Sequence, residues 1–169
     1  MKTVRRRRKE NRTDYEKRIG LLKSHTPRIA FRKSSRYVIA QYITSIGAQD
    51  KIVMGITSRI LLKYGWPEDM KGSLKSIPAS YLTGFYLGKK ILEKKLAVPI
   101  IDFGMIRAVN GSRAFAFIRG LVDSEVKIKH EAESFPDQER IKGTKLKRDF
   151  SVSFAKVKKQ IEIGGQKEE

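Results

Sequence analysis

The residues with the clearest chemical character lie at positions 28–37, where the chain reads Arg-Ile-Ala-Phe-Arg-Lys-Ser-Ser-Arg-Tyr. Cations, hydroxyls and an aromatic ring are close together here. Guanidinium groups pair with phosphates, and a ring can stack on an unpaired base, which is how proteins recognise RNA by shape and by single-stranded bases. An edge hairpin whose charges prevent aggregation would show the same pattern, so the residues alone leave both interpretations open.

A run of cations near the N-terminus could perform related chemistry. Arg5 to Lys9 are consecutive, and Arg12 and Arg18 follow shortly after. Like charges repel and the run has nothing apolar to bury, so it should not fold by itself. A solvated tail or a localisation signal is the plain alternative. We interpret the run as an arm that becomes ordered on phosphates, because the planar fork of arginine makes bidentate contacts with them.

Acids, imidazoles and thiols offer little for catalysis. The chain has no cysteine, and neither His25 nor His130 has a metal-ligand neighbour at a useful spacing. Asp102 falls at the expected end of a strand and could join a two-metal nuclease site, which needs several converging acids. No second strand-end acid is evident. We therefore expect Asp102 to cap a loop or form a salt bridge, and we predict no catalytic residue, metal or cofactor.

The net charge restricts the class of partner. Among 169 residues, 37 are Lys or Arg and 18 are Asp or Glu, giving a formal charge of +19. Self-repulsion of this size is usually offset by a polyanion, either nucleic acid or an anionic membrane surface. The longest apolar run, Leu96 to Ile101, is too short to span a bilayer, and the N-terminus is too basic for a signal peptide. We expect a soluble, intracellular protein with no membrane partner.

Hydrophobic spacing predicts the elements that hold these groups in place. A capping box, Thr13 to Glu16, should start the first helix, and Gly84 and Gly88 should let a later helix approach a sheet closely. Residues 67–76 are expected to be a polar loop. The expected helices lie at 13–27, 58–64, 78–95, 113–124 and 150–161. The expected strands lie at 28–32, 37–44, 52–57, 98–103 and 126–129.

The last helix has an apolar stripe that needs a surface. Phe150, Phe154, Val157 and Ile161 recur at the spacing of one helix face. The sequence leaves open whether this domain or a partner covers the stripe.

Several segments resemble a known family in the right order. The longest is the hairpin at 27–41, and the whole set spans roughly residues 5 to 143. The other segments lie at 12–18, 78–90, 102–104, 111–116, 120–123 and 136–140. Together they resemble large-subunit ribosomal protein family eighteen, and the tail after His130 is similar to its archaeal extension.

This resemblance implies both a fold and a function. The fold is a three-layer, ribonuclease-H-like α/β arrangement with a five-stranded mixed sheet. The function is structural: binding 5S ribosomal RNA and helping to attach it to large-subunit ribosomal RNA in the central protuberance of the cytoplasmic ribosome. Neighbouring ribosomal proteins, including the other 5S-binding one, are the implied partners. A nonspecific nucleic-acid binder and a metal-dependent nuclease on a related fold remain the alternatives.

We therefore predict a basic RNA-binding arm at 1–12, an α/β core domain at 13–130 and a C-terminal extension with an amphipathic helix at 131–169. Arg107 and Arg113 join the predicted RNA contacts, because they flank a glycine loop where backbone can approach RNA. The predicted RNA-binding residues are Arg5, Arg6, Arg7, Arg8, Lys9, Arg12, Arg18, Arg28, Arg32, Lys33, Ser34, Arg36, Tyr37, Arg107 and Arg113.

Overall fold

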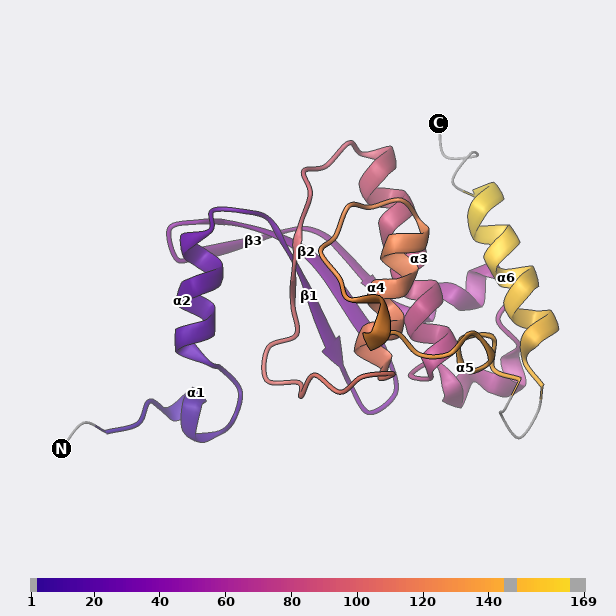
Figure 1. Ribbon diagram of the computed structural model, residues 1–169, viewed down its shortest axis with the longest axis horizontal. Coiled ribbons are helices and arrows are strands. Elements are labelled where there is room, and N and C mark those ends of the chain that lie inside the picture. The colour runs from indigo at the N-terminus through magenta and orange to yellow at the C-terminus, as the bar shows by residue number, and fades with distance from the viewer. Residues whose placement is uncertain (1–2, 145–148, 165–169) are drawn as a thin grey trace.

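Runs of apolar residues form a central mixed sheet of four strands (Figure 1). The computed structural model describes residues 3–144 and 149–164. Three strands follow one another as an antiparallel meander and the fourth lies parallel to the first, so the order across the sheet is β3-β2-β1-β4. The strands are β1 (Arg28–Lys33), β2 (Val38–Ile46), β3 (Gln49–Thr57) and β4 (Ile100–Asp102).

Helices occupy both ends of the described chain and the crossover between β3 and β4. The α-helices are α1 (Arg6–Lys9), α2 (Tyr15–Lys23), α3 (Ile77–Glu93), α4 (Arg113–Asp123), α5 (Gln138–Lys142) and α6 (Ser151–Gly164). Short 3₁₀ helices are η1 (Ser58–Tyr64), η2 (Glu68–Ser73) and η3 (Ala132–Ser134).

Alternation along β1 divides its side chains between two environments. Ile29 and Phe31 are buried in a core that includes Phe117 of α4. Arg28 and Arg32 instead line a cleft with residues of α2. Figure 1 shows α2 on one side of the strands, with α3 and α4 on the other. The strand β1 therefore connects the apolar core to the most basic part of the chain.

Glycines allow α3 and α4 to touch through their backbones. A Cβ atom at Gly84 would collide with the carbonyl oxygen of Phe117, and one at Gly120 would collide with that of Tyr81. A Cβ at Gly88 would meet the side chain of Ser124. We expected Gly84 and Gly88 to bring this helix against a sheet, but they bring it against α4.

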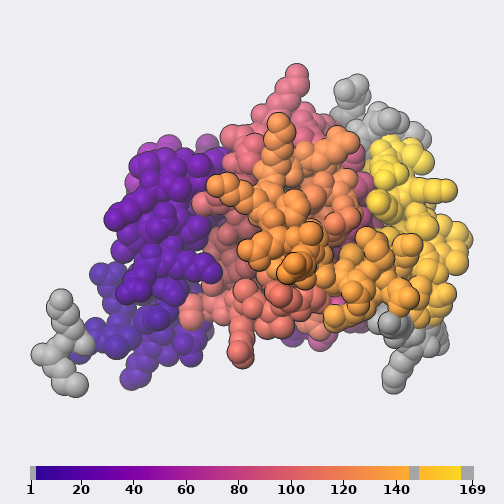
Figure 2. Space-filling model, viewed as in Figure 1, coloured from indigo at the N-terminus to yellow at the C-terminus, as the bar shows by residue number. Residues whose placement is uncertain are grey.

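The C-terminal helix packs on the same domain, which settles the alternative left open by the sequence. Phe154, Val157 and Ile161 are buried in a second core cluster that also contains Leu61 and Phe85. Figure 2 shows this helix and the N-terminal residues at opposite ends of the molecule. Residues 145–148 and 165–169 of the predicted extension lie outside the described residues.

The expected fifth strand at 126–129 is not part of the sheet, so the described residues form four strands instead of five. Glu125 has a positive φ of 76°, and the amide of Val126 donates to the carbonyl of Leu121. Val126 is buried in the core cluster with α3 and α4. These contacts hold the segment against the helices and away from strand pairing.

Three local predictions also need correction. The side chain of Asp14, not Thr13, caps α2, by accepting a hydrogen bond from the amide of Lys17. The basic run contains one helical turn, α1, although it buries no residue. The segment expected to be a polar loop contains η2, whose Met70 carbonyl accepts a hydrogen bond from the indole of Trp66.

Candidate nucleic-acid interface

Cations from the arm, α2 and β1 come together in one cleft of about 140 Å³, which we call the arm cleft. Six of its lining side chains are basic and two are acidic. Residues far apart in the sequence therefore form one positively charged surface, as phosphate binding requires. The lining residues are Arg7, Arg12, Thr13, Asp14, Lys17, Arg18, Leu21, Arg28, Arg32, Asp102 and Gly104.

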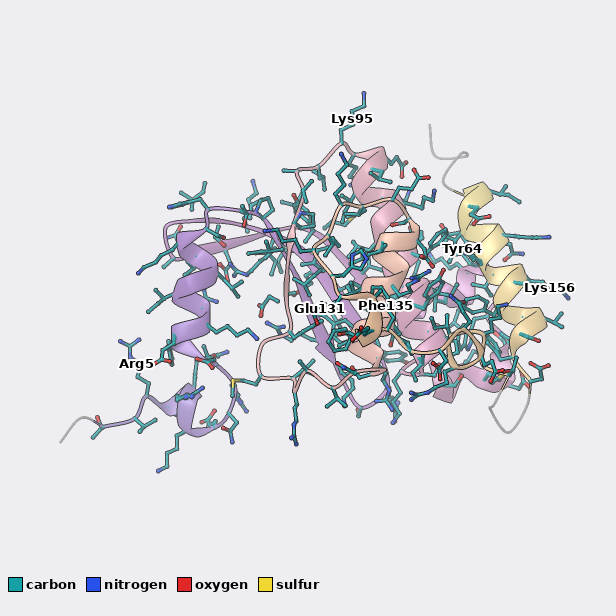
Figure 3. All side chains as sticks on the ribbon, in the orientation of Figure 1. Arg5, Tyr64, Lys95, Glu131, Phe135 and Lys156 are labelled. Atoms are coloured by element: carbon teal, nitrogen blue, oxygen red, sulfur yellow. The ribbon has the colours of Figure 1, made fainter. Side chains whose placement is uncertain are left out.

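The arm is folded back on α2 by contacts made with the start of that helix. Arg7 donates from Nε to Oγ1 of Thr13 at 3.0 Å, and Arg8 forms an ion pair with Asp14 at 3.3 Å. The hydrogen bond from the amide of Lys17 lowers the pKa of Asp14 below its ordinary value, so this carboxylate stays charged. The Arg5 guanidinium lies 4.8 Å from the ring centre of Tyr15. Figure 3 shows Arg5 at this end of the molecule, far from Lys156 of α6.

The other residues of the predicted arm are exposed. Arg6 and Arg12 flank Glu10, at 3.5 Å and 3.3 Å, and Lys9 ends α1 on the surface. Exposed ion pairs of this kind contribute little to stability, so phosphates could replace Glu10 at small cost.

Arg28 was predicted to contact RNA, but its side chain is only 5% exposed. Its guanidinium donates to Asp50 at 2.7 Å and to Ser45 at 2.9 Å. Arg18 pairs with the same carboxylate at 3.0 Å. Burial raises the pKa of Asp50, but the hydrogen bonds from Arg28, Ser45 and Arg18 outweigh it and hold the pKa below its usual value. The ionised Asp50 of β3 therefore connects α2 with strands β1 and β2.

Arg32 is mostly engaged in holding the loop after β4. It donates to the carboxylate of Asp102 at 2.8 Å and to the backbone carbonyls of Asp102 and Phe31. The other carboxylate oxygen of Asp102 accepts from the amide of Gly104 at 2.7 Å. The expected role of Asp102 as a loop cap and salt-bridge partner is thus confirmed. Among the described residues, no group of three or more acids or histidines could hold a metal ion. Asp102, the one acid considered for a nuclease, is paired with Arg32.

The tip of the β1–β2 hairpin is shaped by Ser34. Its hydroxyl donates to the carbonyl of Tyr37 at 2.9 Å and accepts from the amide of Tyr37 at 2.8 Å. Lys33 and Arg36 project from this tip and are exposed. Tyr37 is half-buried, and the Arg59 guanidinium lies 5.5 Å from its ring centre. Sequence reasoning missed Arg59, because only the fold brings the start of η1 beside the hairpin.

The glycine-loop residues Arg107 and Arg113 meet Lys33 of the hairpin in a separate cavity of about 640 Å³, which we call the loop cleft. Arg140 of α5 also lines it and was missed, since no local pattern links α5 to this loop. The lining residues are Phe31, Lys33, Ser76, Ile77, Pro78, Ile106, Arg107, Val109, Gly111, Ser112, Arg113, Ala114, Arg140 and Gly143. Eight of the fifteen predicted RNA-binding residues therefore line one of these two clefts. The seven that line neither cleft are Arg5, Arg6, Arg8, Lys9, Ser34, Arg36 and Tyr37.

No helix in the part of the chain that the structure describes has the length and apolar character needed to cross a membrane.

Comparison with known proteins identifies the family to which this basic chain is similar. A family described as ribosomal large subunit proteins 60S L5 and 50S L18 matches residues 1–99. The large ribosomal subunit protein uL18 of Korarchaeum cryptofilum is 38% identical over 138 residues, covering 82% of this chain and 69% of the relative. The protein of the same name from Methanoculleus marisnigri is 38% identical over 141 residues, covering 83% and 78%. The chain therefore belongs to the uL18 family of large-subunit ribosomal proteins, structural constituents of the cytoplasmic ribosome.

Proposed function

We propose that this chain binds 5S ribosomal RNA and helps to attach it to large-subunit ribosomal RNA in the central protuberance. Membership of the uL18 family supports a structural role in the large subunit. The observation that carries the RNA assignment is the arm cleft, where cations from three elements face one small space. A ribosomal protein needs no catalytic group, and the chain acts as a scaffold between RNA and protein.

Phosphate neutralisation is the main source of affinity in this proposal. The residues of the arm cleft that remain on the surface, Arg7, Arg12 and Lys17, make direct phosphate contacts. Arg28 and Arg32 have positioning roles, because their guanidinium groups already bind Asp50 and Asp102. Arg18 does both, since its side chain pairs with Asp50 yet is 38% exposed.

The hairpin tip gives the interface its shape. Ser34 fixes the turn, so that Lys33 and Arg36 project toward RNA from a rigid support. Preorganised contacts of this kind cost less conformational entropy on binding than contacts from a flexible loop. Tyr37 offers only part of its ring to a base, because Arg59 lies against it.

The remaining parts of the proposal concern organisation. In this proposal the arm at 1–12 binds RNA, the core at 13–130 acts as the scaffold, and the extension at 131–169 supports the core. The layered, ribonuclease-H-like relationship of the fold belongs to the same proposal, supported by helices on both sides of the sheet (Figure 1). Neighbouring ribosomal proteins, including the other 5S-binding one, are the proposed protein partners. Ile46 and Ile52 of the β2–β3 hairpin, 86% and 53% exposed, are a suitable apolar surface for one of them.

The salt dependence of RNA binding tests the phosphate contacts. Affinity of the full chain for 5S RNA should fall by about 10³–10⁵ between 50 and 200 mM salt if roughly six to ten phosphates are neutralised. The double variant Arg7→Ala and Arg12→Ala should weaken binding and reduce the salt slope by about one for each phosphate that is no longer neutralised.

The matched control removes two exposed cations from α6, through Lys156→Ala and Lys159→Ala. Both double variants lose the same charge, but α6 lies at the far end of the molecule from the arm (Figure 3). The arm pair should lower the slope much more than the α6 pair. Equal effects of the two pairs would show that net charge, and not the arm cleft, determines binding. A salt dependence near zero for RNA binding by the native chain would overturn the proposal.

A further inference from the structure

The loop cleft has a chemical character different from that of the arm cleft. Its cavity of about 640 Å³ falls within the roughly 300–1,000 Å³ typical of pockets that enclose a small ligand. Its lining includes both apolar side chains and four cations, and it contains no acid. A ligand that fits it must therefore combine an apolar surface with negative charge.

The N-terminus of α4 opens on this cleft and lacks a side-chain cap. Ser112 occupies the N-cap position, but its hydroxyl makes no hydrogen bond although the atom is buried. The first turn of α4 contains no acidic residue. Free amides at the start of a helix carry a partial positive charge and bind anions. By contrast, the N-terminus of α3, which also lines the cleft, is capped by Ser76.

Basic side chains from separate elements line the cleft together with this helix start. Arg113 is the first residue of α4, and Arg107 lies in the loop before it. Arg140 comes from α5, and its Nη1 atom would be 3.0 Å from a Cβ at Gly111. Lys33 comes from the end of β1. Arginine forks bind phosphate through two hydrogen bonds and also stack on planar bases.

The aliphatic part of the cleft suits a base. Ile77 and Pro78 of α3 line it together with Ile106 and Val109 of the glycine loop. Val109 is 51% exposed, so the loop leaves apolar surface uncovered beside the cations. A base inserted there would bury this surface while its phosphate stayed among the arginines.

We propose that the loop cleft captures one unpaired nucleotide of the bound RNA, with its phosphate at the N-terminus of α4 and its base against Ile106, Val109 and Pro78. The inference rests on the proposed RNA-binding function and assigns a specific site within it. A duplex presents its phosphates on a convex surface and keeps its bases stacked inside, so it cannot enter a bounded cavity. An unpaired nucleotide can present both parts at once, as single-stranded RNA does to many proteins.

Nuclear magnetic resonance of the full, ¹⁵N-labelled chain provides the test. Adenosine 5′-monophosphate should shift the amide signals of residues 111–114 saturably. Adenosine without phosphate, and inorganic phosphate alone, should bind at least tenfold more weakly, because each keeps only half of the interactions. An acidic hexapeptide is included as the probe for a protein ligand. Shifts confined to the arm cleft, no saturable shift at 111–114, or tighter binding of the peptide would overturn the proposal.

Paired variants separate the site from general electrostatics. Arg113→Gln with Arg140→Gln should weaken nucleotide binding by at least about tenfold, since charge-assisted hydrogen bonds to phosphate are removed. Lys127→Gln with Lys129→Gln removes the same charge from exposed positions outside the cleft and should change the affinity less than twofold. Equal effects of the two pairs would contradict a specific site. The amide spectrum of each variant shows whether the fold is retained.

Binding to intact 5S RNA distinguishes the two levels of the proposal. If the native chain binds this RNA tightly but the nucleotide leaves residues 111–114 unaffected, the loop-cleft assignment fails and the RNA-binding function stands. If the chain binds the nucleotide but not the RNA, the proposed function fails. Failure to bind either one would refute both.

Discussion

Replacing Gly84 by alanine should destabilise the protein, even though alanine favours helices. The added Cβ would overlap the carbonyl oxygen of Phe117, far inside the 3.4–4 Å of ordinary van der Waals contact. The opposing atom belongs to the backbone of α4, so no rotamer change can relieve the overlap and the two helices must move apart. Overpacking costs about 1–3 kcal/mol, with the upper part of this range appropriate here, and alanine recovers up to about 1 kcal/mol in helix propensity. The expected net destabilisation is about 1–2 kcal/mol.

Gly20→Ala is the matched control, because Gly20 lies in α2 and a Cβ there would have no neighbour within 4 Å. This variant should gain about 0.5–1 kcal/mol. With urea m-values of about 1–3 kcal/mol/M, the midpoints of the two variants should differ by about 1 M. The expected order is Gly20→Ala, native chain, Gly84→Ala. A Gly84→Ala midpoint equal to or above the native one would refute the backbone contact between α3 and α4.

Two further predictions concern other parts of the fold. Phe154→Ala should lower the free energy of unfolding in urea by about 3–5 kcal/mol, because the ring is buried under α6. Val152→Ala, on the exposed face of that helix, should change the free energy of unfolding by less than about 0.5 kcal/mol. Similar values for the two variants would contradict the packing of α6 on this domain. Asp50→Asn should destabilise the protein at neutral pH by leaving buried Arg28 without its counter-ion. Because the folded pKa of Asp50 lies below its ordinary value, its contribution is fully present above the unfolded carboxyl pKa of about 3.9 and disappears as the pH falls through the folded pKa. The native chain should therefore lose more stability than Asp50→Asn between about pH 5 and 2, and parallel stability curves would contradict this ion pair.

Much of the fold was predictable because its elements carry local signals. The strand β1 follows from alternating apolar residues, and β2 and β3 follow from apolar runs bounded by short turns. The long helix follows from its apolar face and an early proline. Val126 and Ile128 also alternate in this way, yet they pack on the helices, since Glu125 redirects the chain. Periodicity shows which side chains are buried but not whether a strand or a helix covers them.

The interface was predictable in composition but not in arrangement. Charge identified the arm and the hairpin, and the family resemblance identified the glycine loop. Neither could distinguish cations that are free from cations that are paired. Arg28 and Arg32 are engaged by Asp50 and Asp102, which are distant in sequence. Arg140 reaches the loop cleft from α5, a placement fixed only by tertiary packing. Pairing and proximity of this kind depend on the fold.

Competitive binding tests the central claim most directly. The full chain is mixed with labelled 5S RNA at moderate salt and challenged with excess unlabelled tRNA. We predict that the affinity of the protein for 5S RNA is higher by orders of magnitude than its affinity for tRNA. The reason is that the hairpin and the two clefts match a particular RNA shape in addition to its phosphates. If tRNA competes equally, the protein is a nonspecific basic nucleic-acid binder, and the assignment to 5S RNA is contradicted.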